Sequence, residues 1–146
     1  MEPVVSVERP SEIKARLTVA RFECSPEEIT QILGIRPTKT WLRGETVTPR
    51  AKNVHKSNGW TLRAPCDPLN STVDEQVDSL ISIITPHIEA FAKLPTGVYI
   101  ELSCILYVYD YSRPVIGFSA STVRILAQIG ANIDIDIYDL REITLT

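Results

Sequence analysis

The segment Lys14–Gly34 constrains the fold more than any other part of the chain, because it joins a strand pattern directly to a capped helix. Its first ten residues, KARLTVARFE, alternate with period two and include β-branched side chains, which is typical of a strand. Ser25 then supplies an N-cap, Pro26 stands at the first helical position, and Glu28 completes a capping box. Gly34 predicts the C-terminal end of this helix. The sequence therefore requires a short helix immediately after this strand.

The second half of the chain repeats the order of helix and strand. A capping box at Thr72 opens a helix that continues to Leu94, and Pro86 inside the pattern predicts a kink. Val98–Tyr109 is rich in β-branched and aromatic residues, so we expect a central strand there. Pro114–Phe118 is expected to pair with it in antiparallel orientation.

A third capped helix ends at Gly130, and Asn132–Asp139 after it alternates cleanly, which predicts a half-buried strand. Three isoleucines are expected to face inward, namely Ile133, Ile135 and Ile137. The segments Ser25–Gly34 and Ser121–Gly130 also share the spacing of an isoleucine and a final glycine, although any two capped, glycine-ended helices would look alike. Two strand–helix–strand halves favour an α+β fold, a ferredoxin-like two-layer sandwich with a mainly antiparallel sheet and helices on one face.

Length and composition indicate a single folded domain spanning residues 1–146. The hydrophobic fraction of 44% and the charged fraction of 23% are ordinary for a globular protein. No apolar run approaches the roughly 20 residues of a membrane span, and the N-terminus has no secretory signal pattern. The three widely spaced cysteines favour reduced thiols and a cytoplasmic protein. Residues 1–12 are expected to form a flexible arm, and residues 36–58 a long basic loop.

The basic loop is the first candidate binding feature. The segment from Arg36 to Arg63 contains seven basic residues and one acidic residue, although the whole chain has a net charge of −3. Cations beside a tryptophan suit phosphate contacts and base stacking, but a solvated lysine- and arginine-rich loop explains the pattern equally well, and the tryptophan can equally pin the loop to the sheet. The candidate partner- or anion-binding residues are Arg36, Lys39, Trp41, Arg43, Arg50, Lys52 and Lys56.

Acidic residues near the C-terminus form the second candidate feature. Asp134 and Asp136 lie on one face of the predicted strand, with side chains about 7 Å apart, and Asp139 follows them. The pair suits a hard cation or acid–base chemistry, although such residues are more often the solvated face of a strand. His55 and His87 have no partner at metal-ligand spacing, and no nucleophile or phosphate-loop motif is present. The sequence thus indicates no catalytic residues, no metal ligands and no cofactor.

Several of these blocks together resemble a known family. The stretch Ser25–Glu45, with SPEEITQILGI, RPT, a tryptophan and RGE, is similar to the small bacterial domain-of-unknown-function 4279 family. Asn58-Gly59-Trp60, the helix Val73–Leu94 and the closing LAQIGANIDIDIYD of Leu126–Asp139 agree with it in order. The resemblance covers about Ala15 to Asp139 and implies a bacterial, single-domain, cytoplasmic protein. It implies no catalytic residues, and by analogy small families of this kind often contain immunity or interaction proteins.

We therefore expect a non-catalytic protein-interaction module, and an immunity-type inhibitor of a partner protein is one form of it. The charge asymmetry and the exposed acids motivate this expectation, because an acidic surface can neutralise a cationic active site. A polyanion, nucleic-acid or nucleotide binder acting through the basic loop is the alternative. A metal-dependent enzyme using Asp134 and Asp136 is the second alternative. A protein partner is expected and a membrane partner is not, while the oligomeric state stays open.

Overall fold

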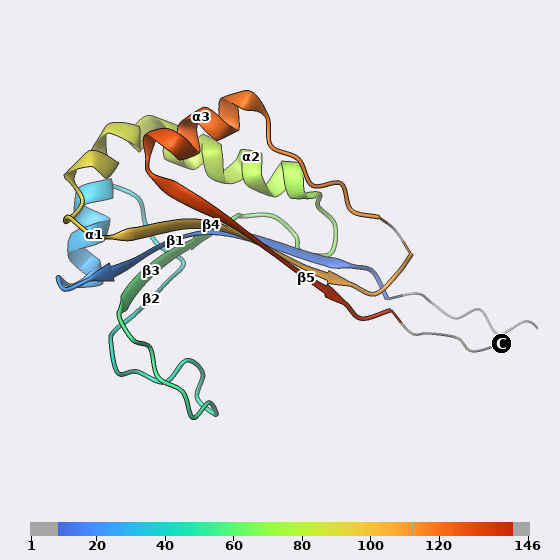
Figure 1. The fold of residues 1–146 in the computed structure, drawn as a ribbon, viewed down its shortest axis with the longest axis horizontal. Helices are drawn as coiled ribbons and strands as arrows, with labels where there is room; N and C mark the ends of the chain where they lie inside the picture. The colour runs from blue at the N-terminus through green and yellow to red at the C-terminus, as the bar shows by residue number, and fades with distance from the viewer. Residues whose placement is uncertain (1–8, 112, 142–146) are drawn as a thin grey trace, which may run out of the picture.

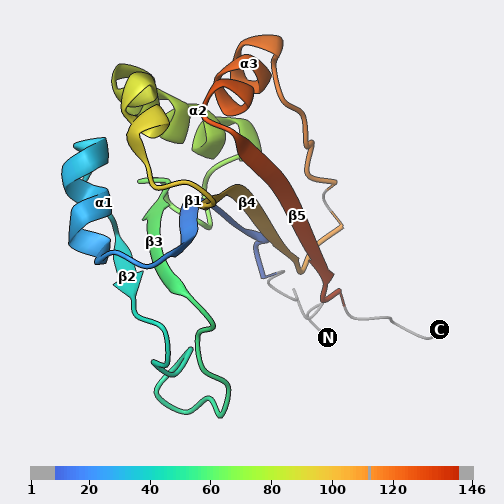
Figure 2. The same ribbon diagram turned by 60° about the vertical axis from the view of Figure 1, so that its left-hand side comes forward.

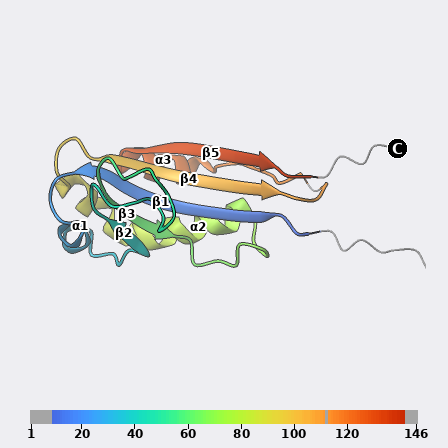
Figure 3. The same cartoon turned by 90° about the horizontal axis from the view of Figure 1, so that it is seen from below.

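The computed structural model describes residues 9–111 and 113–141, which form a five-stranded sheet with helices packed on one face (Figure 1). Figures 2 and 3 show the same two layers from other directions. In chain order the elements are β1 (Glu12–Phe22), α1 (Pro26–Leu33), β2 (Lys39–Trp41), β3 (Asn58–Arg63), α2 (Val73–Ile84), η1 (Thr85–Lys93), β4 (Tyr99–Val108), α3 (Ala120–Gln128) and β5 (Ala131–Asp139). No helix in the described ranges is long and apolar enough to cross a membrane.

The strand order is β2-β3-β1-β4-β5, with β1 at the centre. β1 pairs in antiparallel orientation with β3 and β4, and β2 pairs in the same way with β3. β4 and β5 are parallel, because α3 carries the chain back to the same end of the sheet. The α+β class and the helices on one face are confirmed. The sheet is mixed rather than purely antiparallel, and the ferredoxin-like arrangement stays a prediction.

The predicted caps and helix ends match the structure closely. Ser25 accepts a hydrogen bond from the Glu28 backbone, Thr72 caps α2, and Ser119 caps α3. Gly34 adopts a left-handed φ of 69° at the end of α1. The proline break is also confirmed, because the α-helix ends at Ile84 and the chain continues as the 3-10 helix η1.

The alternation of β1 holds until a β-bulge changes it. Ala15, Leu17 and Val19 are buried beneath the helices, as their spacing predicts. The pairing with β3 shifts between Ala20 and Phe22, so that Phe22 becomes a core residue. Strict alternation along KARLTVARFE would place Phe22 on the face opposite Ala15, Leu17 and Val19, and this expectation was wrong, because a bulge inserts one extra residue and exchanges the two faces.

A buried glutamine completes β1 where β3 has already ended. Gln76 of α2 is only 2% exposed, and its side-chain oxygen accepts a hydrogen bond from the Ala15 backbone at 2.7 Å. Its amide donates to the Ile13 carbonyl at 2.5 Å and to Ser71 at 2.8 Å. The side chain therefore replaces the hydrogen bonds that a longer β3 would have made.

One predicted strand is absent, and the predicted long loop contains a short strand. Pro114–Phe118 forms no strand, because β4 already has β1 on one edge and β5 on the other. Within residues 36–58, expected to be a long loop, Lys39–Trp41 forms the short strand β2, and Thr46 makes only an isolated bridge to Val54. Residues 42–57 project as a loop on the side of the sheet opposite the helices (Figure 1).

Candidate functional site

The helices leave one face of the sheet uncovered, and we call it the open face (Figure 3). It carries an ordered set of polar side chains. Thr18 of β1 and Thr61 of β3 are neighbours, with their hydroxyl oxygens 3.0 Å apart. On β4 the carboxylate of Glu101 accepts hydrogen bonds from the Tyr99 hydroxyl and the Ser103 hydroxyl, both at 2.6 Å. These groups hold one another in place, so the open face has a defined polar centre.

Two of the three predicted acids lie beside that centre. The β4–β5 register pairs Ser103 with Asp134 and Ile105 with Asp136, which places both carboxylates on the open face. We call Glu101, Asp134 and Asp136 the acidic edge. The pKa of Asp134 is raised, chiefly by the charge of Asp136 and then by desolvation and by Glu101. Glu101 was missed by sequence reasoning, although an acid within an apolar strand was a usable signal.

The third predicted acid is already neutralised. Asp139 accepts hydrogen bonds from the guanidinium of Arg141 at 2.6 and 2.7 Å. These bonds lower the pKa of Asp139 to about 2. Asp139 therefore belongs to an ion pair at the end of β5 and adds little to the acidic edge.

The isoleucines of β5 were predicted to face inward, but they do not lie in the core. Ile133, Ile135 and Ile137 are 42%, 37% and 57% exposed, although they align with buried residues of β4. The reason is the position of β5 at the margin of the sheet, where α3 lies only over its start (Figure 2). Alternation predicts which side chains share a face but not whether another layer covers that face.

The seven candidate partner- or anion-binding residues are all exposed except Trp41, which is half-buried. Lys39 and Trp41 belong to β2, and Arg36 precedes it. The ring of Trp41 lies against Gly59 of β3 and stacks on His55, with ring centroids 4.8 Å apart and an interplanar angle of 20°. This packing favours the interpretation in which Trp41 pins the loop to the sheet, because much of the ring is already in contact with protein.

Two of the loop cations are brought together with an arginine that sequence reasoning missed. Arg43 and Lys56 line one cavity together with Arg21, whereas Arg50 and Lys52 do not line it. Arg21 is the bulged residue of β1, and its φ of 60° makes it the one described residue other than glycine with a positive φ. That conformation costs about 1–2 kcal/mol. No local sequence signal predicts it, because the bulge depends on pairing with β3.

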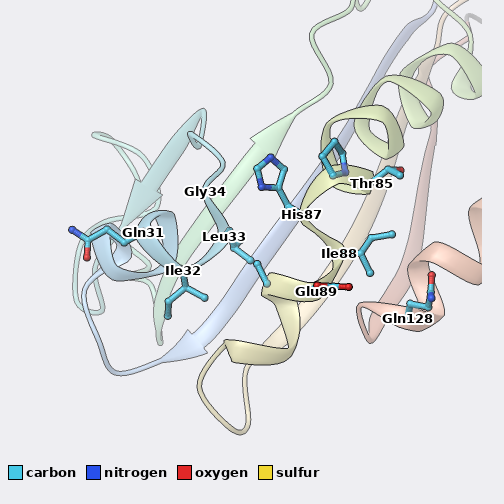
Figure 4. Close-up of a pocket in the computed structure, with 11 residues that line it drawn as sticks. Gln31, Ile32, Leu33, Gly34, Thr85, His87, Ile88, Glu89 and Gln128 are labelled. Atoms are coloured by element: carbon cyan, nitrogen blue, oxygen red, sulfur yellow. The ribbon is translucent and has the colours of Figure 1, made fainter.

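A cavity of about 550 Å³ lies between α1 and η1 (Figure 4). Its ionisable residues are His87 and Glu89, and the imidazole of His87 lies near Gly34. Figure 4 shows that the two side chains point to different parts of the cavity. They do not form an acid–base pair, so this cavity offers no catalytic arrangement that we recognise.

Metal-binding and thiol chemistry find little support in the described residues. No group of three or more His, Cys, Asp or Glu side chains in residues 9–111 and 113–141 is placed to hold a metal ion. Cys24 and Cys66 are half-buried, and Cys104 is buried. Burial raises the pKa of Cys104 to about 11, which keeps that thiol protonated near neutral pH.

Comparison with known proteins gives one finding. A family model described as "Domain of unknown function (DUF4279)" matches residues 11–140, which is most of the chain. No curated protein and no solved structure matches the chain.

Proposed function

Because the chain belongs to the DUF4279 family, whose description assigns no activity, we propose a function from its surface: it is a non-catalytic protein-interaction module that binds a partner protein along β5. One observation supports this most directly. β5 is an edge strand, and within the described ranges it pairs only with β4. An exposed edge strand is a ready template for a strand from another chain.

The side chains of β5 define the chemistry of the partner. One face of the strand presents Ile133, Ile135 and Ile137, and the other presents Asp134 and Asp136. The partner strand should therefore alternate apolar residues with lysine or arginine. A nearby cation would relieve the repulsion that raises the pKa of Asp134, so the acidic edge adds electrostatic selectivity to the backbone pairing.

A second copy of the chain is a poorer partner. Any pairing of two β5 strands that keeps the isoleucines on one face also keeps the aspartates together on the other. In the antiparallel arrangement centred on Ile135, Asp134 of one copy faces Asp136 of the other. Like charges directly opposite one another destabilise a strand pair. The acidic edge thus disfavours self-association and favours a basic partner.

An enzyme with a cationic active site meets this description, and covering such a site is how an immunity-type inhibitor would act. The same proposal places the protein in the bacterial cytoplasm, since its three free cysteines suit a reducing compartment.

The test uses a defined probe. A synthetic peptide of about eight residues that alternates valine and lysine should bind the protein, and a valine–glutamate peptide should not. Titration followed by two-dimensional NMR should shift the amide signals of β5 first. Replacing both Asp134 and Asp136 with asparagine should lower the affinity of the protein for the valine–lysine peptide about tenfold.

The matched control removes the same charge elsewhere. Asp74 and Asp78 are exposed on α2, so the double change to asparagine there should alter affinity by less than about twofold. Equal binding of the lysine and glutamate peptides, or equal loss in the two double variants, would refute the proposed surface.

One observation favours the second candidate, a binder of nucleic acid or another polyanion. The cations of the basic loop are exposed, and the loop projects from the sheet (Figure 1). Such a binder requires affinity for a single-stranded oligonucleotide that falls steeply as salt rises. The absence of binding at low salt would exclude this function.

A further inference from the structure

A separate cavity lies between the end of β1 and the basic loop, and no residue of β5 lines it. Its volume is about 350 Å³. We call it the cationic pocket, and it is lined by Arg21, Phe22, Glu23, Arg43, Lys56, Ser57 and Asn58. None of its lining residues belongs to β5 or to the acidic edge, so a ligand bound there does not depend on the protein-interaction proposal.

Two polar side chains build the walls of the cationic pocket. Asn58 accepts a hydrogen bond from the Arg43 backbone at 2.8 Å and donates one to the Cys24 carbonyl at 3.1 Å. It therefore ties the basic loop to the turn that follows β1. Ser57 accepts a hydrogen bond from the Arg21 backbone at 3.3 Å, which joins the loop to the bulge itself. The pocket is thus held together by contacts between distant segments and not by one flexible loop.

The charges in the pocket are unbalanced. Three cations, Arg21, Arg43 and Lys56, line it together with one acid, Glu23. Within the described ranges the ion pairs join Lys14 to Glu12 and Arg141 to Asp139, so they involve none of these cations. Like charges that line one cavity repel one another, and a bound anion would relieve that repulsion.

The position of Arg21 is the second independent sign of function. A glycine would adopt its left-handed backbone without strain, yet the chain has an arginine there. The bulge turns this side chain across the open face, with its guanidinium 4.6 Å from the centre of the Tyr99 ring. Strained residues at bulges often mark ligand sites, because a bulge re-aims one side chain.

We propose that the cationic pocket binds the phosphate group of a phosphorylated ligand. A phosphate carries up to two negative charges and accepts several hydrogen bonds, which suits a small cavity lined by two arginines and one lysine. A free phosphorylated metabolite and a phosphorylated side chain of a protein share this chemistry.

The experiment titrates the protein with four probes at constant ionic strength: inorganic phosphate, phosphoserine, a phosphoserine peptide and sodium acetate. Binding is followed by the NMR amide signals of residues 21–23 and 56–58. Saturable shifts with phosphate and phosphoserine, but not with acetate, are expected. Tighter binding of the peptide would identify a protein ligand, and equal binding of phosphoserine would identify a small molecule. Equal shifts with acetate, or no saturable shift, would overturn the proposal.

Matched variants separate the pocket from the general charge of the loop. Arg43→Gln and Lys56→Gln should each weaken phosphoserine binding about tenfold. Arg50→Gln and Lys52→Gln remove the same charge from the same loop outside the pocket, and they should change affinity less than about twofold. An equal loss in all four variants would show diffuse attraction and overturn the discrete site.

Arg21→Gly provides a test that does not depend on weakening the fold. Glycine accepts the left-handed backbone, so the midpoint of thermal unfolding should stay the same or rise. The affinity for phosphoserine should nevertheless fall about tenfold. Unchanged affinity in a stably folded Arg21→Gly protein would contradict the role of this side chain.

Discussion

Replacing Gly59 with alanine should destabilise the protein solely through Trp41. Gly59 lies on β3 directly opposite Trp41 of β2, and a Cβ atom at position 59 would lie 1.9 Å from Cε2 of the indole. The backbone of Gly59 is not left-handed, so alanine meets no conformational obstacle there. The clash with the ring is therefore the whole cost, which makes the position a clean test of how the basic loop is anchored.

The magnitude follows from the size of the overlap. Carbon atoms in contact normally lie about 3.5–4.0 Å apart, so the ring must retreat by roughly 1.5–2 Å. Forcing extra carbon into a packed site costs about 1–3 kcal/mol, and alanine recovers about 0.5–1 kcal/mol over glycine in a strand. The net loss should be about 1.5 kcal/mol, or about 3–6 °C in the unfolding midpoint of a chain of this length.

A double-mutant cycle measures this coupling. Urea unfolding would be followed by far-ultraviolet circular dichroism, which does not depend on either tryptophan. In a Trp41→Ala background, Gly59→Ala should become neutral or stabilising, which gives a coupling free energy of about 2 kcal/mol. Gly117→Ala is the control, because its added Cβ atom meets nothing within 4 Å. That change should alter stability by less than about 1 kcal/mol.

An equal cost of Gly59→Ala in the two backgrounds would refute the assigned contact. A cost below about 0.5 kcal/mol in the native background would do the same, since it would mean that the ring moves freely. In either case Trp41 could not be what holds the loop against the sheet. If the contact is correct, Gly59→Ala should also weaken phosphate binding, because the loop carries Arg43 and Lys56 into the pocket.

Three further predictions concern stability. Gln76→Leu should lower the free energy of unfolding by about 2–4 kcal/mol, because it leaves two buried backbone groups of β1 without partners. Urea titration would measure this loss, and a value below about 1 kcal/mol would contradict the bridging role of Gln76. Asp134→Asn should stabilise the protein progressively as pH rises from about 3 to about 7, since a carboxyl with a raised pKa in the folded state favours folding only while it is protonated. Urea titrations of both proteins at each pH should show a difference in the free energy of unfolding that grows as pH rises. A difference that stays constant with pH would contradict the prediction. Thr72→Ala should cost about 1 kcal/mol through loss of the α2 cap, and a change within the error of thermal unfolding would argue against the cap.

The sequence alone determined the local structure of this protein. The caps at Ser25 and Thr72, the stop at Gly34 and the break before Pro86 depend on neighbours within a few residues, so local chemistry was enough to predict them. The alternation of β1 likewise marked it as a strand, and the apolar character of β4 marked it as a central one. The same local patterns marked β5 as a strand and the basic loop as exposed.

Only the tertiary structure decided which surfaces are left for function. The bulge that re-aims Arg21 depends on the register of β1 with β3, and the meeting of Glu101 with Asp134 depends on the parallel pairing of β4 with β5. The exposure of the β5 isoleucines was predicted wrongly for the same kind of reason. Alternation specifies two faces of a strand, but the order of strands and the reach of the helical layer determine which face is covered, and both depend on contacts between residues far apart in the chain.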